Sequence, residues 1–465
     1  MPPRRTEKDA LGRVRVPADA YYGAQTQRAR ENFPISGRRL QRPFLRALGE
    51  VKVAAARVNT SLGLLDPKLG RAIEAAAKEV ASGKHDSQFV VDLFQTGSGT
   101  STHMNSNEVV AGRANEMLTG KRGGKSPVHP NDHVNLGQSS NDVIPTALHL
   151  SALEEIENDL LPALRLLKKR LEEKARQFKD VVKAGRTHMQ DALPVTLGQE
   201  FSAYAAQLDH RIRRVESARN HLQELAIGGT AVGTGVGAHS EFAEEVVSEL
   251  RKMTGIEDLR RAENPFEALG AKDAAVEASG ALKTVAVSLT KIANDLRLMS
   301  SGPRAGLGEI DLPAIQPGSS IMPGKVNPVV PEAVTMACAQ VIGNDAAITL
   351  GGMGGFLELN MMMPLIAYDL LESIQLLAGA SRVLAERCVK GITAHPERCL
   401  RQAESSMALV TALAHDLGYD RAAKVARRVV DEDLSVKEAL AKEGVSKDKI
   451  NKMLDLKRLV RPHGK

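Results

Sequence analysis

The sequence predicts a mainly α-helical protein built on a bundle of long helices. Residues 142–176 repeat apolar side chains at intervals of three or four, the period of a helix; these are Leu153, Ile156, Leu160, Leu164, Leu167 and Leu171. Comparable runs return at 197–226, 238–254, 270–300, 327–350 and 356–390. A helix of ~30 residues is about 45 Å long, more than a compact monomer needs. We therefore expect the bundle to continue across a subunit interface. A monomeric solenoid is the alternative, but the sequence lacks its 20–50-residue repeat.

The remaining segments fit around this bundle. Residues 12–16 suggest a short strand, and 43–82 predict Ala-rich helices. Between 96 and 142, residues rich in Gly, Ser, Thr and Asn predict loops flanking a helix at 102–118, and Pro162 should bend or restart the helix that contains it. Shorter helices follow residue 394. We expect three domains: 1–140, mixed but mostly helical; 141–394, the long-helix bundle; and 395–465, a small helical domain.

Composition excludes several classes of function. The net charge is +6 in 465 residues and aromatic residues make up 3%, so no aromatic-rich basic surface for nucleic acid is expected. The N-terminus has no apolar signal region, and no stretch approaches the ~20 apolar residues of a membrane span. The sequence predicts a soluble, cytoplasmic protein that does not act at a membrane.

No metal or cofactor is expected. Cys338, Cys388 and Cys399 lack paired or CxxC spacing, which favours a reducing compartment and argues against an iron–sulfur cluster. His129 and His133 have zinc-like spacing, but Pro130 lies between them and no carboxylate–histidine set accompanies them.

Residues 318–328 form the most informative segment, Gly-Ser-Ser-Ile-Met-Pro-Gly-Lys-Val-Asn-Pro. Its glycines and prolines disfavour both helix and strand and predict a loop. Ser319, Ser320, Lys325 and Asn327 offer donors that can surround a small anion, and a serine there can act as a base if its alkoxide is stabilised. The alternative from composition alone is a polar surface turn.

This loop resembles the signature loop of the fumarase/aspartase superfamily. Further similar motifs occur in the family's order; they are 23–27 (Gly-Ala-Gln-Thr-Gln), 96–100 (Thr-Gly-Ser-Gly-Thr), 129–132 (His-Pro-Asn-Asp), 138–142 (Gln-Ser-Ser-Asn-Asp), 185–190 (Gly-Arg-Thr-His-Met-Gln) and 229–235 (Gly-Thr-Ala-Val-Gly-Thr-Gly). The resemblance runs from Arg5 to about Gly418. It implies the three-domain fumarase/aspartase fold, with a 20-helix core in a homotetramer. It also implies a small dicarboxylate substrate and active sites that are each shared by three subunits.

The resemblance also implies roles for individual residues. Ser319 corresponds to the catalytic base, and His188, partnered by Glu332, would hold a water or protonate a leaving group. The implied substrate-binding residues are Ser98, Gly99, Thr100, Ser139, Ser140, Asn141, Thr187, Ser320, Lys325, Val326 and Asn327. On composition alone, a helix N-cap would be the better interpretation of Ser98 and Ser139. His129, Pro130, Asn131 and Asp132 correspond to a second, outer dicarboxylate site.

Within the superfamily, most motifs resemble class II fumarases, so fumarate hydration to L-malate is expected. Ser140 is typical of fumarases, as are 23–27, 31–36, 332–336, 356–360 and 406–419. Two features, Ser101-Thr102 and Val329–Glu332, look like aspartase usage, so aspartate ammonia-lyase is the alternative. His103 departs from both, since Asn is usual there, and Gly237 replaces a common Asn. A non-enzymatic descendant should have lost Ser319, Lys325 or His188, and all three are present.

Overall fold

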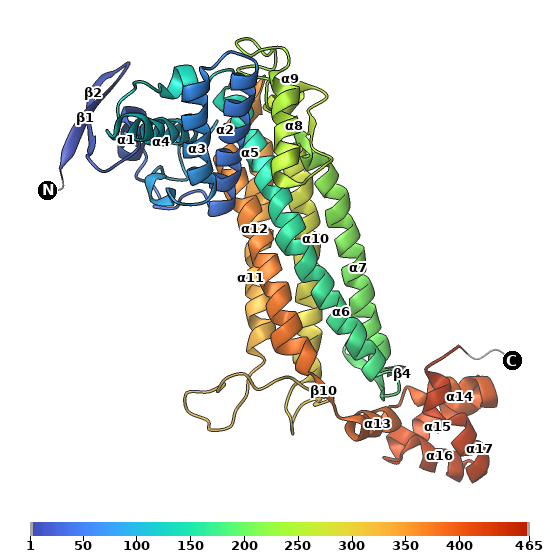
Figure 1. The fold of residues 1–465 in the computed structure, drawn as a ribbon. Helices are drawn as coiled ribbons and strands as arrows, with labels where there is room; N and C mark the ends of the chain where they lie inside the picture. Colours follow the sequence, from blue (N-terminus) through green and yellow to red (C-terminus); the bar gives the residue numbers. More distant parts are fainter. Residues whose placement is uncertain (1–2, 463–465) are drawn as a thin grey trace. The chain divides into compact units, whose positions relative to one another are not determined.

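The computed structural model describes residues 3–462, apart from the side chains of Ala412 and His415, and the chain is dominated by helices (Figure 1). It divides into two compact units. Unit 1 comprises 1–162, 213–286 and 338–378; unit 2 comprises 163–212, 287–337 and 379–465. The three-domain division expected from the sequence stays a prediction.

Unit 1 holds the N-terminal strands and the helices that pack around α2. Its elements are β1 (Arg4–Asp9), β2 (Gly12–Pro17), α1 (Ala24–Asn32), α2 (Arg42–Ser61), α3 (Pro67–Ala81), η1 (Asp86–Gln88), α4 (Thr100–Thr119), η2 (Pro130–Val134), α5 (Ser140–Glu155), η3 (Ile156–Leu160), β5 (Glu224–Leu225), α8 (Phe242–Thr254), β6 (Arg260–Arg261), α9 (Pro265–Gly270), β8 (Gly355–Phe356) and β9 (Leu359–Asn360). α2 packs against α3, α5 and α8, which lie beside it in Figure 1. Both α2 and α4 are therefore buried on most of their faces, including polar positions.

Unit 2 holds a hairpin and the small C-terminal helices. Its elements are β3 (Val182–Thr187), β4 (Gln190–Thr196), β7 (Ile310–Asp311), η4 (Leu384–Cys388), η5 (Val389–Gly391), β10 (Thr393–Ala394), α13 (Pro396–Ser405), α14 (Leu409–Leu417), α15 (Tyr419–Asp431), α16 (Val436–Lys442), α17 (Lys447–Met453) and α18 (Leu456–Leu459). The hairpin and the C-terminal helices share one apolar core, to which Val182, Ala184, Ala403 and Leu413 contribute.

Each apolar run expected to be helical contains a helix; 238–254 contains α8, and 356–390 is helical only from Met363, after the β8–β9 hairpin. Outside 238–254, five long helices make up most of these runs. They are α6 (Leu161–Gln177), α7 (Leu197–Leu222), α10 (Asp273–Met299), α11 (Val329–Gly352) and α12 (Met363–Val383). The predicted restart near Pro162 is also confirmed: α5 ends at Glu155, one π-helical turn follows, and α6 begins at Leu161. Proline has no N–H to donate within the preceding turn, so the helical hydrogen-bond pattern changes there.

Among the described residues, α11 is long and apolar enough to cross a membrane by length and composition alone. This corrects the expectation that no stretch of the chain approaches that length. Two polar residues inside it are nevertheless buried and bonded to other helices. Asp345 accepts a hydrogen bond from Ser279 and pairs with Lys283, and Asn344 donates to Glu372. Buried polar side chains that find hydrogen-bond partners on neighbouring helices are typical of a helix packed inside a protein bundle.

Candidate active site

The segment 318–328 is a loop, as predicted, and it leads directly into α11. The N–H of Gly318 donates to the carbonyl of Lys325 at 2.8 Å, and the side-chain amide of Asn327 donates to the carbonyl of Gly318. A Cβ on Gly318 would lie 2.6 Å from both the Asn327 N and the Lys325 O. The two ends of the loop can therefore close this tightly only around a glycine.

The hydroxyl of Ser319 is held by its own loop. Its Oγ accepts hydrogen bonds from the backbone N–H groups of Ile321, at 3.2 Å, and Met322, at 2.9 Å. Two N–H dipoles directed at one oxygen favour negative charge on it. The loop is thus arranged to stabilise a Ser319 alkoxide, as the role of a base requires.

The side chains of the neighbouring loop residues are exposed to solvent. Ser320, Lys325 and Val326 are exposed, and the Lys325 ammonium has no ion-pair partner among the described residues of the chain. Glu332 lies in the first turn of α11 and is half-buried. An exposed, unpaired ammonium beside Ser319 is free to meet an anionic substrate.

Thr187 and His188 lie at the tip of the β3–β4 hairpin, an element that sequence analysis missed. His188 and Met189 form its two-residue turn, and both have positive φ, 54° and 62°. Positive φ at both central residues is what a tight two-residue hairpin turn requires, although it is costly for residues other than glycine. Thr187 and His188 are exposed, so the hairpin presents both to whatever faces its tip.

A buried cluster of ion pairs holds strand β3 of this hairpin in place. Lys183, in β3, pairs with Glu200 and with Glu309, and Arg186 pairs with Glu309 at 2.7 Å. The side chain of Glu309 is fully buried. Two cations on one buried carboxylate fix the direction of β3. Burial raises the pKa of Glu200, although Lys183 acts in the opposite direction.

A cavity of about 500 Å³ lies beside His188, lined also by Met189, Tyr204, Lys291 and Asp295. Within it, the Tyr204 hydroxyl donates to Asp295 at 2.8 Å, and Lys291 pairs with the same carboxylate. All of these residues belong to unit 2. The imidazole of His188 therefore borders open space that a small molecule or another protein segment can occupy.

Ser98, Gly99 and Thr100 lie at the start of α4. Gly99 is the N-cap, so Ser98 does not have the capping role that its composition had suggested. The Ser98 hydroxyl instead contacts the Thr100 hydroxyl at 2.8 Å. Because the first N–H groups of a helix lack intrahelical partners, this end of α4 suits a carboxylate.

Ser139, Ser140 and Asn141 lie at the start of α5. Ser139 is the N-cap within a capping box completed by Asp142, so here the structural interpretation is correct. The Asn141 side chain donates to the carbonyl of Ala231 at 2.7 Å. Ser140 Oγ contacts His103 Nδ1, one turn into α4, at 2.8 Å. The first turns of α4 and α5 therefore meet, and two positive helix ends lie close together.

Lys52 is a residue of this region that sequence analysis missed. It lies in the middle of the amphipathic helix α2, and a lysine there is normally interpreted as solvent-facing. It is instead 1% exposed and contacts His103 Nε2 at 2.7 Å. The one available signal was His103 itself, whose identity departs from the family's usual Asn.

The predicted outer site, 129–132, forms the start of a π-helical turn. His129 Nδ1 accepts hydrogen bonds from the N–H groups of Asn131 and Asp132, both at 3.2 Å. Burial lowers the pKa of His129, against the attraction of Asp132. Both the lowered pKa and the two N–H groups directed at Nδ1 favour the neutral form of His129.

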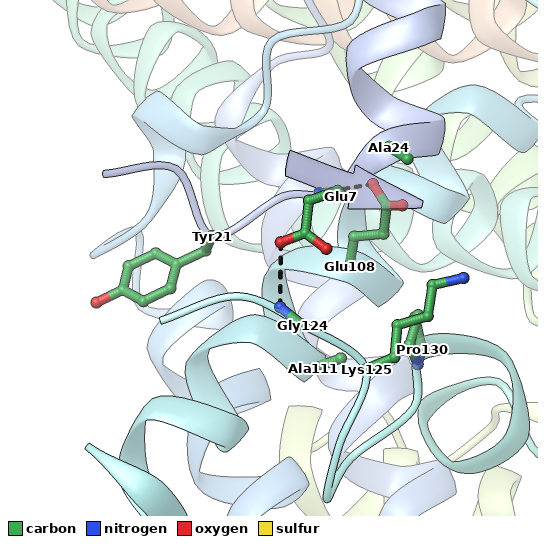
Figure 2. A pocket seen from close by; sticks show the side chains of 9 residues that line it. Glu7, Tyr21, Ala24, Glu108, Ala111, Gly124, Lys125 and Pro130 are labelled. Atoms are coloured by element: carbon green, nitrogen blue, oxygen red, sulfur yellow. Dashed lines mark hydrogen bonds between the residues drawn. The ribbon is translucent and has the colours of Figure 1, made fainter. Parts of the chain in front are cut away.

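The chain just before this turn is anchored around a cavity of about 10 Å³, no larger than one water (Figure 2). Glu7 accepts a hydrogen bond from the Gly124 N–H at 3.1 Å, and Lys125 and Pro130 lie on another side. Glu108 accepts from three N–H groups at the start of α1. Both carboxylates are thus used to hold the backbone, and the cavity is too small for a dicarboxylate.

The predicted site residues fall into two groups in one chain. Ser98–Thr100, Ser139–Asn141 and 129–132 belong to unit 1; Thr187, His188, the loop 318–328 and Glu332 belong to unit 2. Among the described residues of one chain, no hydrogen bond or ion pair joins His188 to Glu332. Their predicted partnership stays a prediction.

Comparison with known proteins identifies the family. A model of a lyase family matches residues 12–343, and a model described as the fumarase C C-terminus matches 409–461. The chain is 55% identical over 447 residues to a class II fumarate hydratase of Mycobacterium tuberculosis (strain CDC 1551 / Oshkosh), covering 96% of this chain and 93% of the relative. It is 54% identical to the class II fumarate hydratase of Nitrosomonas europaea, with 95% of each covered.

Solved structures agree with these relatives. The class II fumarase of Schistosoma mansoni matches with a TM-score of 0.96 and 40% identity, over 99% of this chain and 100% of that one. A fumarate lyase:delta crystallin of Brucella melitensis, bound to cobalt, matches with a TM-score of 0.94 and 48% identity, over 99% and 100%. The ordered motifs, the Ser319 loop and similarity along nearly the whole chain lead to one conclusion: the chain belongs to the class II fumarate hydratase family of lyases.

Proposed function

We propose that this protein catalyses the reversible hydration of fumarate to L-malate. The observation that carries the proposal is the 52–55% identity to class II fumarate hydratases over nearly the whole chain. The loop around Ser319 and the exposed His188 supply the chemistry that this reaction needs.

In the dehydration of L-malate, Ser319 removes the proton from the carbon next to a carboxylate. The electrons of the broken C–H bond spread into that carboxylate, which becomes an aci-carboxylate group with two negative charges. The N–H groups of Ile321 and Met322 stabilise the Ser319 alkoxide before the transfer. Lys325 and Asn327 bind the carboxylate that gains charge, Lys325 as a point charge and Asn327 as a neutral donor.

The hydroxyl leaves as water from the opposite face, with His188 as the group that delivers the proton or holds the water. Glu332 orients the imidazole. Ser320, Val326 and Thr187 complete the wall beside these groups. The starts of α4 and α5 bind the other carboxylate; the residues involved are Ser98, Gly99, Thr100, Ser139, Ser140 and Asn141.

We further propose a homotetramer in which each active site is shared by three subunits. Three long apolar side chains of α11 support assembly: Met336 is 68% exposed, Leu350 65% and Ile342 41%. Exposed apolar residues along a helix this long favour burial against another chain. The absence of a His188–Glu332 contact within one chain also fits a site completed by neighbouring subunits.

The segment 129–132 is proposed as an outer dicarboxylate site, with Lys125 rather than His129 as its cation. Lys125 is exposed and lies four residues before His129 in the chain. Substitution of Lys125 by Met should weaken dicarboxylate binding at this site and leave turnover at saturating substrate unchanged.

One experiment tests the main proposal. The purified protein is incubated with fumarate, either in water alone or with ammonium, and the products are identified. L-Malate in both reactions is expected, with activity that survives chelation and exposure to oxygen. Aspartate formed as fast as malate, or faster, would instead support the ammonia-lyase alternative.

A further inference from the structure

His103 connects the predicted substrate contact Ser140 to a fully buried lysine. His103 and Lys52 are each 1% exposed. His103 Nε2 lies 2.7 Å from Lys52 Nζ, and His103 Nδ1 lies 2.8 Å from Ser140 Oγ. The imidazole therefore contacts Lys52 with one nitrogen and Ser140 with the other. In a neutral imidazole one nitrogen donates and the other accepts, so the two contacts are coupled.

The surroundings of Lys52 require it to donate. Its Nζ lies 2.7 Å from Gln138 Oε1 and 3.4 Å from Asn135 Oδ1. The Gln138 amide nitrogen donates to the carbonyls of Val134 and Leu136, which fixes its oxygen toward Lys52. The Asn135 amide nitrogen likewise donates to the carbonyl of Gln138. Two of the protons on Nζ are therefore committed to these two oxygens.

The third tetrahedral position on Lys52 Nζ holds either a proton or a lone pair, and this determines which way the Ser140 hydroxyl proton points. When Lys52 is protonated, its third proton goes to His103 Nε2, and His103 Nδ1–H donates to Ser140 Oγ. The Ser140 hydroxyl proton must then point away from His103. When Lys52 is neutral, Nζ accepts from Nε2–H, and Nδ1 becomes an acceptor that draws the Ser140 proton back toward the imidazole.

The charged groups around Lys52 and His103 allow both protonated and neutral Lys52 near neutral pH. Burial lowers the pKa of Lys52 to about 7, although Asp142 on α5 acts to raise it. The pKa of His103 on α4 lies well below its usual value, through burial and then the charge of Lys52. Burial raises the pKa of Asp142 to about 7, and three backbone N–H groups oppose that rise. On the other helices packed against α2, Glu74 of α3 and Glu249 of α8 pair with Arg57.

We propose that His103 is a positioning residue that sets the direction of the Ser140 hydroxyl proton according to whether Lys52 carries a proton. With Lys52 protonated, Ser140 donates to a substrate carboxylate at the start of α5. With Lys52 neutral, Ser140 donates to His103, and the substrate meets its lone pairs instead. Substrate binding thus weakens as pH rises. This inference rests on the proposed function, because the carboxylate that Ser140 meets belongs to that substrate.

The test compares KM for L-malate in the wild type and in Lys52→Met, from pH 6 to pH 8.5. Loss of one hydrogen bond to a carboxylate should raise KM about 10-fold. We therefore expect the ratio of variant to wild-type KM to fall from about 10 at pH 6 to about 1 at pH 8.5. Because the hydroxyl affects binding more than proton abstraction, the ratio of kcat values should stay within about three-fold.

A second variant keeps the inference falsifiable if Lys52→Met does not fold. Ser140→Ala removes the hydroxyl itself, so its KM ratio to wild type should fall with pH in the same way. Adding Lys52→Met to Ser140→Ala should then change KM no further, because the two substitutions act through one hydroxyl. A ratio that stays constant with pH in Ser140→Ala overturns the inference.

Lys272→Met is the matched control. Lys272 is also buried, at 2% exposure, but it donates to the carbonyls of Ala268, Leu269 and Ala271. Among the described residues it shares no hydrogen bond with Lys52, His103 or Ser140. Its KM ratio should stay near one at every pH, and a fall like that of Lys52→Met would overturn the inference. If the wild type does not interconvert fumarate and L-malate, the proposed function fails as well. A constant ratio with wild-type turnover intact overturns only the role of His103.

Discussion

At the scale of single residues, the hydroxyl of Ser319 differs from the other hydroxyls of the candidate site. It accepts hydrogen bonds from two backbone N–H groups of its own loop. The Ser139 hydroxyl instead caps α5, and the Ser98 hydroxyl contacts Thr100. A serine is a weak base because its alkoxide is unstable in water, and aligned N–H groups reduce that cost. This local arrangement supports Ser319 as the base.

Substitution of Ser319 by Ala should lower kcat by at least about 10⁴-fold, since positioned general bases contribute about 10²–10⁴-fold and this proton is weakly acidic. The fold should be retained, because the hydroxyl is partly exposed and bonds only within its loop. Steady-state kinetics with L-malate, alongside size-exclusion chromatography, measures both. Ser320→Ala is the comparison and should mainly raise KM. A Ser319→Ala enzyme with a third of wild-type turnover would assign Ser319 a binding role only.

His149 allows a stability prediction with a definite sign. Its Nδ1 bonds the carbonyl of Glu224 at 2.8 Å, and burial lowers its pKa to about 4. The unfolded chain binds this proton below about pH 6.5, whereas the folded chain binds it only near pH 4. Folding stability should therefore decrease as pH falls from about 6.5 to 4, by up to about 3 kcal/mol from this residue. His149→Gln should lose that part of the dependence in denaturant unfolding at pH 7 and pH 5. If the free energy of unfolding fell equally in the variant and the wild type between pH 7 and pH 5, the role of His149 would be contradicted.

At the scale of elements, the loop 318–328 and the β3–β4 hairpin use backbone geometry to place chemistry. The loop closes through the Gly318–Lys325 hydrogen bond, and the hairpin turns on two residues with positive φ. The pairing of β3 with β4 shifts register between Ala184 and Gly185, a few residues before that turn. Paired elements with fixed ends hold side chains more precisely than open loops do, which suits the alignment that catalysis requires.

Substitution of Gly318 by Ala tests the loop closure. The added Cβ would lie 2.6 Å from Lys325 O and Asn327 N, so the ends must separate. Displacement of Ser319 relative to Lys325 by about 1 Å should cost about 10²-fold in kcat/KM. Gly324→Ala is the matched control in the same loop: its φ is +81°, but nothing lies within 4 Å of the added atom. A larger loss in Gly324→Ala than in Gly318→Ala would show that general loop strain, rather than closure, controls activity.

At the scale of the whole molecule, the candidate residues belong to two units of the chain, and α11 carries exposed apolar side chains. Both features fit the proposed shared active site. A chain whose catalytic groups are completed by its neighbours should be inactive as a monomer.

Complementation tests the sharing directly. Ser319→Ala and His188→Asn should each be inactive. If different chains supply these two residues to one site, mixed tetramers contain some sites with both wild-type residues. Co-refolding the two variants should therefore restore measurable malate dehydration, up to about a quarter of wild type if the chains mix randomly. Demonstrably mixed tetramers without any activity would place both residues on the same chain.

The sequence by itself determined the helical architecture and the chemical types of residue at the site. Apolar periodicity predicted α6, α7, α10, α11 and α12 because a helical face depends on residues three and four apart. Glycine and proline predicted the loop at 318–328, because they limit the backbone within a few residues. The β3–β4 hairpin was missed, since Gly185 and Pro194 interrupt the strand pattern and its turn contains no glycine.

Only the tertiary structure decided how the site's polar groups are used. Ser98 and Ser139 each lie just before a helix, but only Ser139 is a cap. Lys52 and His103 are 51 residues apart and His103 and Ser140 are 37 apart, so packing alone brings them together. Whether a lysine in a helix faces water or a buried imidazole depends on which helices cover it. That burial, which no local pattern encodes, turns Lys52 into a proton-dependent neighbour of the site.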